Sequence, residues 1–270
     1  MQKTILITGS TDGIGLETAK ALVSKGHKVL IHGRTPDKLA AAEKALSKLA
    51  DAKNIESYVA DLSNISEVDA LAKSVIGRHI KLDVLINNAG AYKTPHPFTQ
   101  GGMDVRFMVN TIAPYLLTQK LLSLMDSSAR VVNLSSAAQS PVDSEALAGR
   151  IKLSDDFTAY AQSKLALTMW SHHLAQSLKE KGPMIVAVNP GSLLATKMVK
   201  EGFNVPGKDI HIGSDILVRA ALSDEFASAS GQYFDNDSGR FSDPHPDTLD
   251  SQKVAEIVQT IEAVLDVRIN

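Results

Sequence analysis

The sequence contains no cysteine, no long hydrophobic run and no excess of one charge. Without cysteine the chain cannot form disulfides, use a thiolate nucleophile or bind zinc through sulfur. Its 28 basic and 30 acidic residues give a net charge of -2 without a basic stripe, which disfavours nucleic acid as the main partner. No stretch approaches the ~18 apolar residues of a membrane span, and the apolar run at 5–7 is too short for a signal peptide. We therefore expect a soluble, cytoplasmic protein.

Short apolar runs alternate with helical patterns along the 270 residues, which is typical of a parallel sheet with crossover helices. The predicted strands are 4–8, 28–32, 55–60, 84–87, 130–134, 184–189 and a weaker 232–234. The predicted helices lie near 14–25, 37–49, 65–78, 103–125, 158–181, 212–222 and 249–267. No linker or internal repeat divides the chain. The sequence predicts a single α/β domain over 1–270, with a doubly wound Rossmann sheet of about seven parallel strands and helices on both faces.

Three glycines follow the first predicted strand, directly before a predicted helix. Glycine lets the backbone turn tightly and approach a pyrophosphate, whose charge is met by the free N–H groups at the helix start. The alternative is a strand-to-helix turn that binds nothing. We predict that the turn binds a dinucleotide through Gly9, Ser10, Thr11, Asp12, Gly13, Ile14 and Gly15.

The segment from Thr8 to Gly15 resembles the T-G-x-x-x-G-x-G motif of the short-chain dehydrogenase/reductase family, in its compact single-domain branch. The resemblance runs in register over about residues 4–200, and the stretch 87–122 and the long gap between Ser136 and Tyr160 are similar to the retinol-dehydrogenase-like subgroup. Further segments match the family in the same order: Asp61-Leu62, Asn87-Asn88-Ala89-Gly90, Asn110, Ser135-Ser136, Tyr160-x-x-x-Lys164, and Pro190-Gly191 with Thr196.

The resemblance implies a bound NAD(P)(H) and hydride transfer between a carbonyl compound and an alcohol. It implies that Asp61 and Leu62 contact the adenine and that Thr196 contacts the nicotinamide carboxamide, although Thr196 is equally explained as an ordinary loop cap. The other residues that it assigns to the cofactor are Asn88, Ala89, Gly90, Tyr160, Lys164, Pro190 and Gly191.

Tyr160 and Lys164 lie four residues apart in a predicted helix and therefore share one face. A tyrosine normally ionises near pH ~10, and an adjacent ammonium favours its phenolate form. We predict that Tyr160 donates a proton to the carbonyl oxygen in reduction and removes the alcohol proton in oxidation. By itself the pair is equally consistent with a surface tyrosine beside a solvated lysine, but the glycine turn and the serines favour catalysis.

Two further catalytic residues follow from the resemblance. Ser136 is expected to hold the reacting oxygen, with Ser135 as the alternative. Asn110 is an amide in an otherwise apolar helix, so it must find partners. It either satisfies a kink near Pro114 or, as the resemblance implies, anchors a water that connects the lysine to solvent.

The end of the second predicted strand bears on the choice of cofactor. NAD-specific folds carry an acidic residue about 20 residues beyond the glycine turn. Gly33 and Arg34 stand there instead, and Asp37 is expected in the first turn of the next helix. An arginine suits a 2'-phosphate, and Gly33 leaves room for it. NADP(H) is therefore favoured, with dual use of NAD(H) as an intermediate case and an exposed arginine without a ligand as the alternative.

We predict an NADP(H)-dependent oxidoreductase that interconverts an aldehyde or ketone and an alcohol, on a small-to-medium and largely apolar substrate. The alternatives are a non-catalytic dinucleotide-sensing regulatory protein on this fold and an epimerase/dehydratase-type relative. Ser136, Tyr160 and Lys164 count against the first, and the glycine spacing counts against the second. The segments expected to select the substrate are 92–98, 137–159 and the substrate loop at about 193–212.

The helix that contains Tyr160 is apolar around much of its circumference, with Leu165, Leu167, Met169, Trp170 and Leu174. This pattern predicts a homodimer or homotetramer, unless the segment before Tyr160 covers the helix. No metal is expected, because the sequence lacks an H-E-x-x-H motif and the adjacent His172 and His173 point apart.

Overall fold

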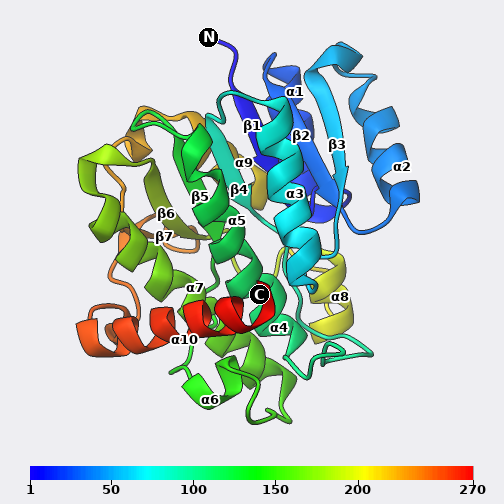
Figure 1. Ribbon diagram of the computed structural model, residues 1–270. Coiled ribbons are helices and arrows are strands. Elements are labelled where there is room, and N and C mark those ends of the chain that lie inside the picture. Colours follow the sequence, from blue (N-terminus) through cyan, green and yellow to red (C-terminus); the bar gives the residue numbers. More distant parts are fainter. Residues whose placement is uncertain (270) are drawn as a thin grey trace.

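Eight strands form one sheet in the computed structural model, which describes residues 1–269 (Figure 1). The spatial order is β3-β2-β1-β4-β5-β6-β7-β8, and only the β7–β8 pair is antiparallel. The strands are β1 (Thr4–Ile7), β2 (Lys28–Gly33), β3 (Ile55–Val59), β4 (Val84–Asn87), β5 (Arg130–Leu134), β6 (Met184–Asn189), β7 (Tyr233–Asp235) and β8 (Arg240–Ser242). The predicted strands are confirmed. The sequence prediction missed only β8, which has three residues and is too short to show a period.

Alternate residues of the central strands are buried on opposite faces of the sheet. In β1, Ile5 and Ile7 belong to one hydrophobic core and Leu6 belongs to the other. A parallel strand that is covered on both faces needs apolar residues at successive positions, which is why these strands are continuous apolar runs.

Helices cover both faces, as the predicted doubly wound fold requires (Figure 1). Helices α1, α2 and α9 supply one core, and α3, α5, α7 and α10 supply the other. Their bounds are α1 (Gly13–Ser24), α2 (Pro36–Leu46), α3 (Ile65–Arg78), α4 (Val105–Phe107), α5 (Ala113–Leu121), α6 (Ser144–Leu147), α7 (Asp156–Leu178), α8 (Lys197–Phe203), α9 (His211–Leu222) and α10 (Ser251–Ile269). Among the described residues, none of the helices has the length and apolar character needed to cross a bilayer.

The helix predicted over 103–125 is interrupted in the structure. A π-helical segment, η2 (Met108–Ile112), separates α4 from α5. Pro114 explains the interruption, because it has no N–H to donate to the carbonyl of Asn110 and its ring crowds that carbonyl. The backbone instead bonds from Ala113 N to Met108 O. The chain thus places Asn110 inside the irregular turn.

The apolar circumference of α7 is covered within a single chain. Helix α10 crosses α7 and packs on it with a face of buried aliphatic residues, and α6 packs on α10 (Figure 1). The α7 residues Leu165, Leu167, Met169, Trp170 and Leu174 are all buried. The pattern that predicted an oligomer is therefore explained by packing inside the chain, where α7 is covered by β6, α4, η2 and α10 and not only by the segment before Tyr160. Oligomerisation itself stays a prediction.

Candidate active site

The glycine turn joins β1 to α1 at the carboxyl end of the sheet, where β1 and β4 are neighbours. Gly9 has a φ of +63°, and a Cβ at this position would lie 2.8 Å from the Cα of Ala89. A Cβ on Gly15 would lie 2.4 Å from Nδ2 of Asn88. Only glycine therefore allows the turn to pack against the segment that follows β4. Ligands in doubly wound folds bind at such a switch point between strands.

Asn88 and Thr8 hold the two segments together. Nδ2 of Asn88 donates to the carbonyls of Thr8 and Gly9, at 2.8 and 2.9 Å. The Thr8 hydroxyl oxygen accepts from the backbone N–H groups of Asn88 and Ala89, each at 3.1 Å. The Asn88 side chain is thus occupied in fixing the shape of the glycine turn.

His32 is a residue of this site that the sequence reasoning missed. Its side chain is buried, and Nδ1 accepts from the N–H of Gly9 at 3.1 Å. Nδ1 therefore carries no proton, so Nε2 donates to the carbonyl of Ala60 at 3.0 Å. Burial lowers the pKa of His32 to about 4. The neutral imidazole ties together the ends of β1, β2 and β3, and Ser10 adds bonds to the His32 backbone.

The start of α1 fits a phosphate group. Asp12 stands at the N-cap but makes no side-chain bond to the first-turn amides. Gly13 has a φ of +58°, and beyond its own turn and helix a Cβ there would meet, among the described residues, only Cγ2 of Thr196, at 4.0 Å. An uncapped helix start with open space beside it attracts an anion through its N–H groups and dipole. Thr196 caps α8 by accepting from the N–H of Val199 at 3.2 Å, as the plainer interpretation expected.

At the end of β2, Arg34 is exposed, as a residue that meets a ligand phosphate from solvent would be. A Cβ on Gly33 would lie 2.4 Å from Cγ2 of Thr11, so glycine at this position also makes room for the Thr11 side chain. Asp37 lies in the first turn of α2, as predicted. Lys38, which was not predicted, adds a second positive charge, with Nζ 3.8 Å from a carboxylate oxygen of Asp12.

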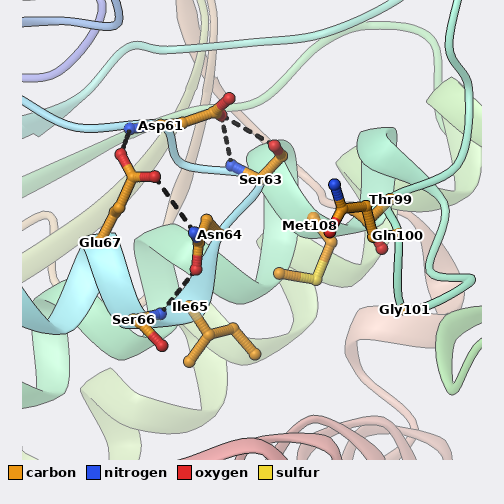
Figure 2. Close-up of a pocket in the computed structure, with 10 residues that line it drawn as sticks. All are labelled: Asp61, Ser63, Asn64, Ile65, Ser66, Glu67, Thr99, Gln100, Gly101 and Met108. Carbon is orange, nitrogen blue, oxygen red and sulfur yellow. Dashed lines mark hydrogen bonds between the residues drawn. The ribbon is translucent and has the colours of Figure 1, made fainter.

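A cavity of about 490 Å³ opens between the start of α3 and the segment before α4 (Figure 2). Asp61 lies at its rim, where Oδ1 accepts from the N–H and the hydroxyl of Ser63. The Asp61 N–H donates to Glu67 at 2.7 Å. The lining residues are Asp61, Ser63, Asn64, Ile65, Ser66, Glu67, Thr99, Gln100, Gly101 and Met108. The predicted adenine residue Asp61 is thus at an open cavity, whereas the Leu62 side chain is buried in the core.

Two other residues predicted to contact the cofactor follow β6. The carbonyl of Pro190 accepts from Nδ2 of Asn236 at 2.9 Å. Gly191 has a φ of +115°, which favours glycine, and its N–H donates to Asn189 Oδ1 at 3.3 Å. Ile14, at the start of α1, packs against Gly213 of α9, which anchors the glycine turn from the other side.

Tyr160 and Lys164 lie on one face of α7, as predicted. Nζ of Lys164 is 5.7 Å from the centre of the Tyr160 ring and donates to the carbonyl of Leu134 at 2.7 Å. Lys164 is buried, and this burial lowers its pKa to about 8. Burial raises the pKa of Tyr160, while a hydrogen bond from Ser136 lowers it. Desolvation, which the sequence does not reveal, is therefore the largest influence on the pKa of Tyr160.

The structure distinguishes the two serines after β5. The Ser135 hydroxyl is buried and lies 2.7 Å from Oγ1 of Thr168, so it joins β5 to α7. The Ser136 hydroxyl accepts from the N–H of Ala138 at 3.1 Å, and its interaction with the Tyr160 phenol lowers the pKa of that group. Of the two serines, Ser136 is therefore the one that interacts with Tyr160.

Asn110 finds the partners that a buried amide needs. Its Oδ1 accepts from the N–H of Ala91 at 2.7 Å, and Nδ2 donates to the Ala91 carbonyl at 2.9 Å and to the Ser163 hydroxyl at 2.9 Å. A Cβ on Gly90 would lie 3.6 Å from Oδ1 of Asn110 and 3.9 Å from Nζ of Lys164. The structure thus brings the side chains of both residues close to Gly90.

Tyr92 lies against Tyr160, with ring centres 5.2 Å apart in an edge-to-face arrangement. Helix α8 covers Tyr92 from the other side, because a Cβ on Gly202 would lie only 2.5 Å from Cε1 of the Tyr92 ring. The expectation that the 92–98 and 193–212 segments border the site agrees with this contact. The sequence does not reveal that they touch each other.

A buried ion-pair network joins α4 to the start of α7. Arg106 is 1% exposed and donates to both carboxylate oxygens of Asp104, at 2.8 and 2.6 Å, and also to Asp156. Asp156 is the first residue of α7 and lies one turn before Tyr160. The sequence offered no signal for this network, because Arg106 and Asp156 are far apart in the chain.

Comparisons with known proteins agree with this geometry. A model of the short chain dehydrogenase family matches residues 3–205. Retinol dehydrogenase 13 of Mus musculus is 30% identical over 268 residues, which cover 93% of this chain and 80% of that protein. Retinol dehydrogenase 12 of Homo sapiens is 33% identical over 248 residues, covering 86% of this chain and 77% of that protein.

Solved structures share the fold. An uncharacterised protein from Mycobacterium paratuberculosis superimposes with a TM-score of 0.79 at 26% identity, covering 98% of this chain and 94% of that one. A short chain dehydrogenase from Salmonella enterica gives a TM-score of 0.69 at 25% identity, covering 87% and 96%. The chain therefore belongs to the short chain dehydrogenase family and is an NAD(P)-dependent oxidoreductase with similarity to the retinol dehydrogenases.

Proposed function

We propose that this protein interconverts an aldehyde or ketone and the corresponding alcohol with NADP(H), and that Tyr160 is the general acid and base. One observation supports this most strongly. The Tyr160 phenol interacts with the Ser136 hydroxyl at the carboxyl end of the sheet, and Nζ of the buried Lys164, on the same helix face, lies 5.7 Å from the centre of its ring. A proton donor, a second hydroxyl and a cation thus converge beside the glycine turn.

The pKa of Tyr160 indicates which direction of the reaction, reduction or oxidation, the site favours. Because burial raises this pKa, the phenol keeps its proton at neutral pH and is ready to act as an acid. In reduction, the Ser136 hydroxyl would hold the carbonyl oxygen while Tyr160 protonates it. The cofactor, when bound, supplies or accepts the hydride. In oxidation Tyr160 must first lose its proton, which the hydrogen bond from Ser136 assists.

We propose that Lys164 and Asn110 help to return a proton to Tyr160 after it has protonated the substrate. Nζ of Lys164 is fixed by the Leu134 carbonyl close to the Tyr160 ring. Asn110 holds the segment after β4 against α7 through Ala91 and Ser163, which places its π-helical turn next to Lys164. We propose that a water at this turn connects Lys164 to solvent.

The preference for NADP(H) rests on the charges at the end of β2. Arg34 is exposed beside the glycine turn, and Lys38 lies near it on α2. The nearest carboxylate after β2 is Asp37, which lies in the first turn of α2. A guanidinium in this position suits the 2'-phosphate of NADPH.

The proposal is tested by mixing the protein with NADPH and a panel of aldehydes and ketones, and by following the loss of NADPH absorbance. We expect turnover of at least one apolar aldehyde or ketone, and slower turnover with NADH. A protein that binds NADPH tightly but turns over none of the panel would instead favour the dinucleotide-sensing alternative.

A further inference from the structure

The substrate loop follows β6 and leads into α9, and its two ends are hydrogen-bonded to each other in a narrow neck. We define the neck as residues 193–195 and 207–208. The N–H of Lys208 donates to the Leu193 carbonyl at 2.7 Å, and the N–H of Ala195 donates to the Lys208 carbonyl at 2.8 Å. Gly207 packs so closely that a Cβ would lie 2.6 Å from the Cα of Ala195. The two segments that lead into and out of α8 are therefore bonded to each other and do not move independently.

The turn between β7 and β8 holds both ends of this neck. Asp237 accepts from the N–H of Ser192 at 2.9 Å and from its hydroxyl. The same carboxylate accepts from Nδ2 of Asn189 at 2.9 Å, and Nζ of Lys208 lies 3.8 Å away. Nδ2 of the adjacent Asn236 donates to the carbonyls of Pro190 and Ile212. One surface turn thus contacts the chain immediately before the substrate loop and at its far end.

These contacts of the β7–β8 turn are needed because the neck contains an unfavourable backbone conformation. Leu193 has a φ of +55°, in the left-handed region that a leucine rarely adopts. A leucine in this conformation persists only when its surroundings fix it. The charge-assisted bonds between Ser192 and Asp237 are directly adjacent and can do so.

Helix α8, in the middle of the substrate loop, lies close to the catalytic residues. Gly202 of α8 packs on the Tyr92 ring, and Tyr92 lies edge-on against Tyr160. Cε of Met198 lies 3.5 Å from the Cβ position of Gly90, beside Lys164. A displacement of the neck would therefore move α8 and, through Tyr92, change the surroundings of Tyr160.

We propose that Asp237 is a positioning residue that sets α8 against Tyr92 and so determines how the carbonyl substrate fits beside Tyr160. This inference rests on the proposed function. Asp237 does not contact the reacting atoms. It acts through Ser192, the neck and α8.

The experiment compares Asp237→Ala, Asp237→Asn and the control Asp243→Ala, which removes the same charge from an exposed residue just after β8. Each protein is digested briefly with trypsin under native conditions, and mass spectrometry measures cleavage after Lys197, Lys200 and Lys208. The carbonyl KM and kcat are measured with the best substrate of the panel. Thermal unfolding confirms that each variant is folded.

We expect cleavage in the loop to be about 10-fold faster in Asp237→Ala than in wild type. Its carbonyl KM should rise more than its kcat falls, because the loss affects the fit of the substrate rather than proton transfer. Asp237→Asn keeps an acceptor for Ser192 and should lie between Asp237→Ala and wild type. Asp243→Ala should match wild type in both readouts.

Equal cleavage rates in Asp237→Ala and Asp243→Ala would overturn the proposal, as would an unchanged carbonyl KM in Asp237→Ala. Proteolysis does not depend on catalysis. If wild type reduced no carbonyl, the proposed function would fail while the cleavage rates still tested the hold of Asp237 on the neck.

Discussion

At the scale of single residues, His32 links cofactor binding to the stability of the fold. Its neutral imidazole accepts from Gly9 and donates to Ala60, so protonation of Nδ1 removes the acceptor that shapes the glycine turn. Burial lowers its pKa from 6.5 to about 4. The unfolded chain therefore binds this proton at a higher pH than the folded protein does.

This difference predicts a loss of stability in acid. Between pH 6.5 and about 4 the unfolded state carries more protons on His32, so the free energy of unfolding falls as the pH falls through this window. Over the whole window the loss amounts to about 3 kcal/mol. Urea unfolding at pH 7 and pH 4.5 measures most of this loss.

The variant His32→Asn keeps an acceptor and a donor but does not titrate, so it should lose less stability than wild type over the same pH change. His96→Asn removes an exposed histidine and should behave as wild type does. Equal acid sensitivity of His32→Asn and wild type would contradict the assigned environment of His32.

Arg34 is the residue expected to distinguish the two cofactors. One lost charge-assisted contact is worth roughly 1.5 to 3 kcal/mol, so Arg34→Ala should weaken NADPH binding by about 10- to 100-fold. Binding of NADH should hardly change, because NADH lacks the 2'-phosphate. Cofactor titrations and kcat/KM with both cofactors measure the effect.

Arg240→Ala is a suitable control, because Arg240 is an exposed arginine on β8. It should leave both affinities unchanged. If Arg34→Ala weakened NADH and NADPH equally, or if wild type preferred NADH, Arg34 would not recognise the phosphate.

At the scale of elements, the relation between α4 and α7 shows where sequence patterns stop being informative. The Tyr160 and Lys164 pair follows from the helical period, which is local, and the structure confirms that they share a face. The Arg106 network does not follow from it, because Asp156 approaches Arg106 only in the folded chain. Pro114 marks the π-helical turn in the sequence, but the hydrogen bonds of Asn110 to Ala91 and Ser163 form only in the folded chain.

The buried network predicts a large cost for Arg106→Ala. The substitution leaves Asp104, which is 4% exposed, without its cation, and breaking a buried pair costs about 3 to 5 kcal/mol. Arg150→Ala is the matched control, because its pair with Glu145 is exposed to solvent and contributes little to stability. Urea unfolding of both variants gives the comparison. Similar losses in the two variants would contradict the role of Arg106 in joining α4 to α7.

At the scale of the whole molecule, the order of apolar runs predicted the doubly wound sheet and its crossover helices, because buried parallel strands need successive apolar residues. It did not predict where α10 lies. The buried face of α10 is visible in the sequence as a helical period, but its contact with α7 depends on the complete fold. The prediction of an oligomer rested on the apolar circumference of α7, because the sequence does not show that α10 packs on this helix.

The candidate site is likewise assembled by the whole sheet. Motifs after β1, β4, β5 and β6 meet because parallel strands place their carboxyl ends at one edge. The sequence predicted these motifs from their order. It could not predict α8 or its contact with Tyr92, because a short helix inside an irregular loop has no period long enough to recognise.

The kcat of Tyr160→Phe tests the central claim most directly. This variant keeps the ring that packs on Tyr92 but removes the transferable proton, so kcat for carbonyl reduction should fall by about 10²- to 10⁴-fold while the NADPH affinity stays close to that of wild type. Tyr58→Phe removes a hydroxyl that bonds to Glu56 and should leave kcat unchanged. A Tyr160→Phe protein that reduced the carbonyl as fast as wild type would contradict the proposed role of Tyr160 in proton transfer.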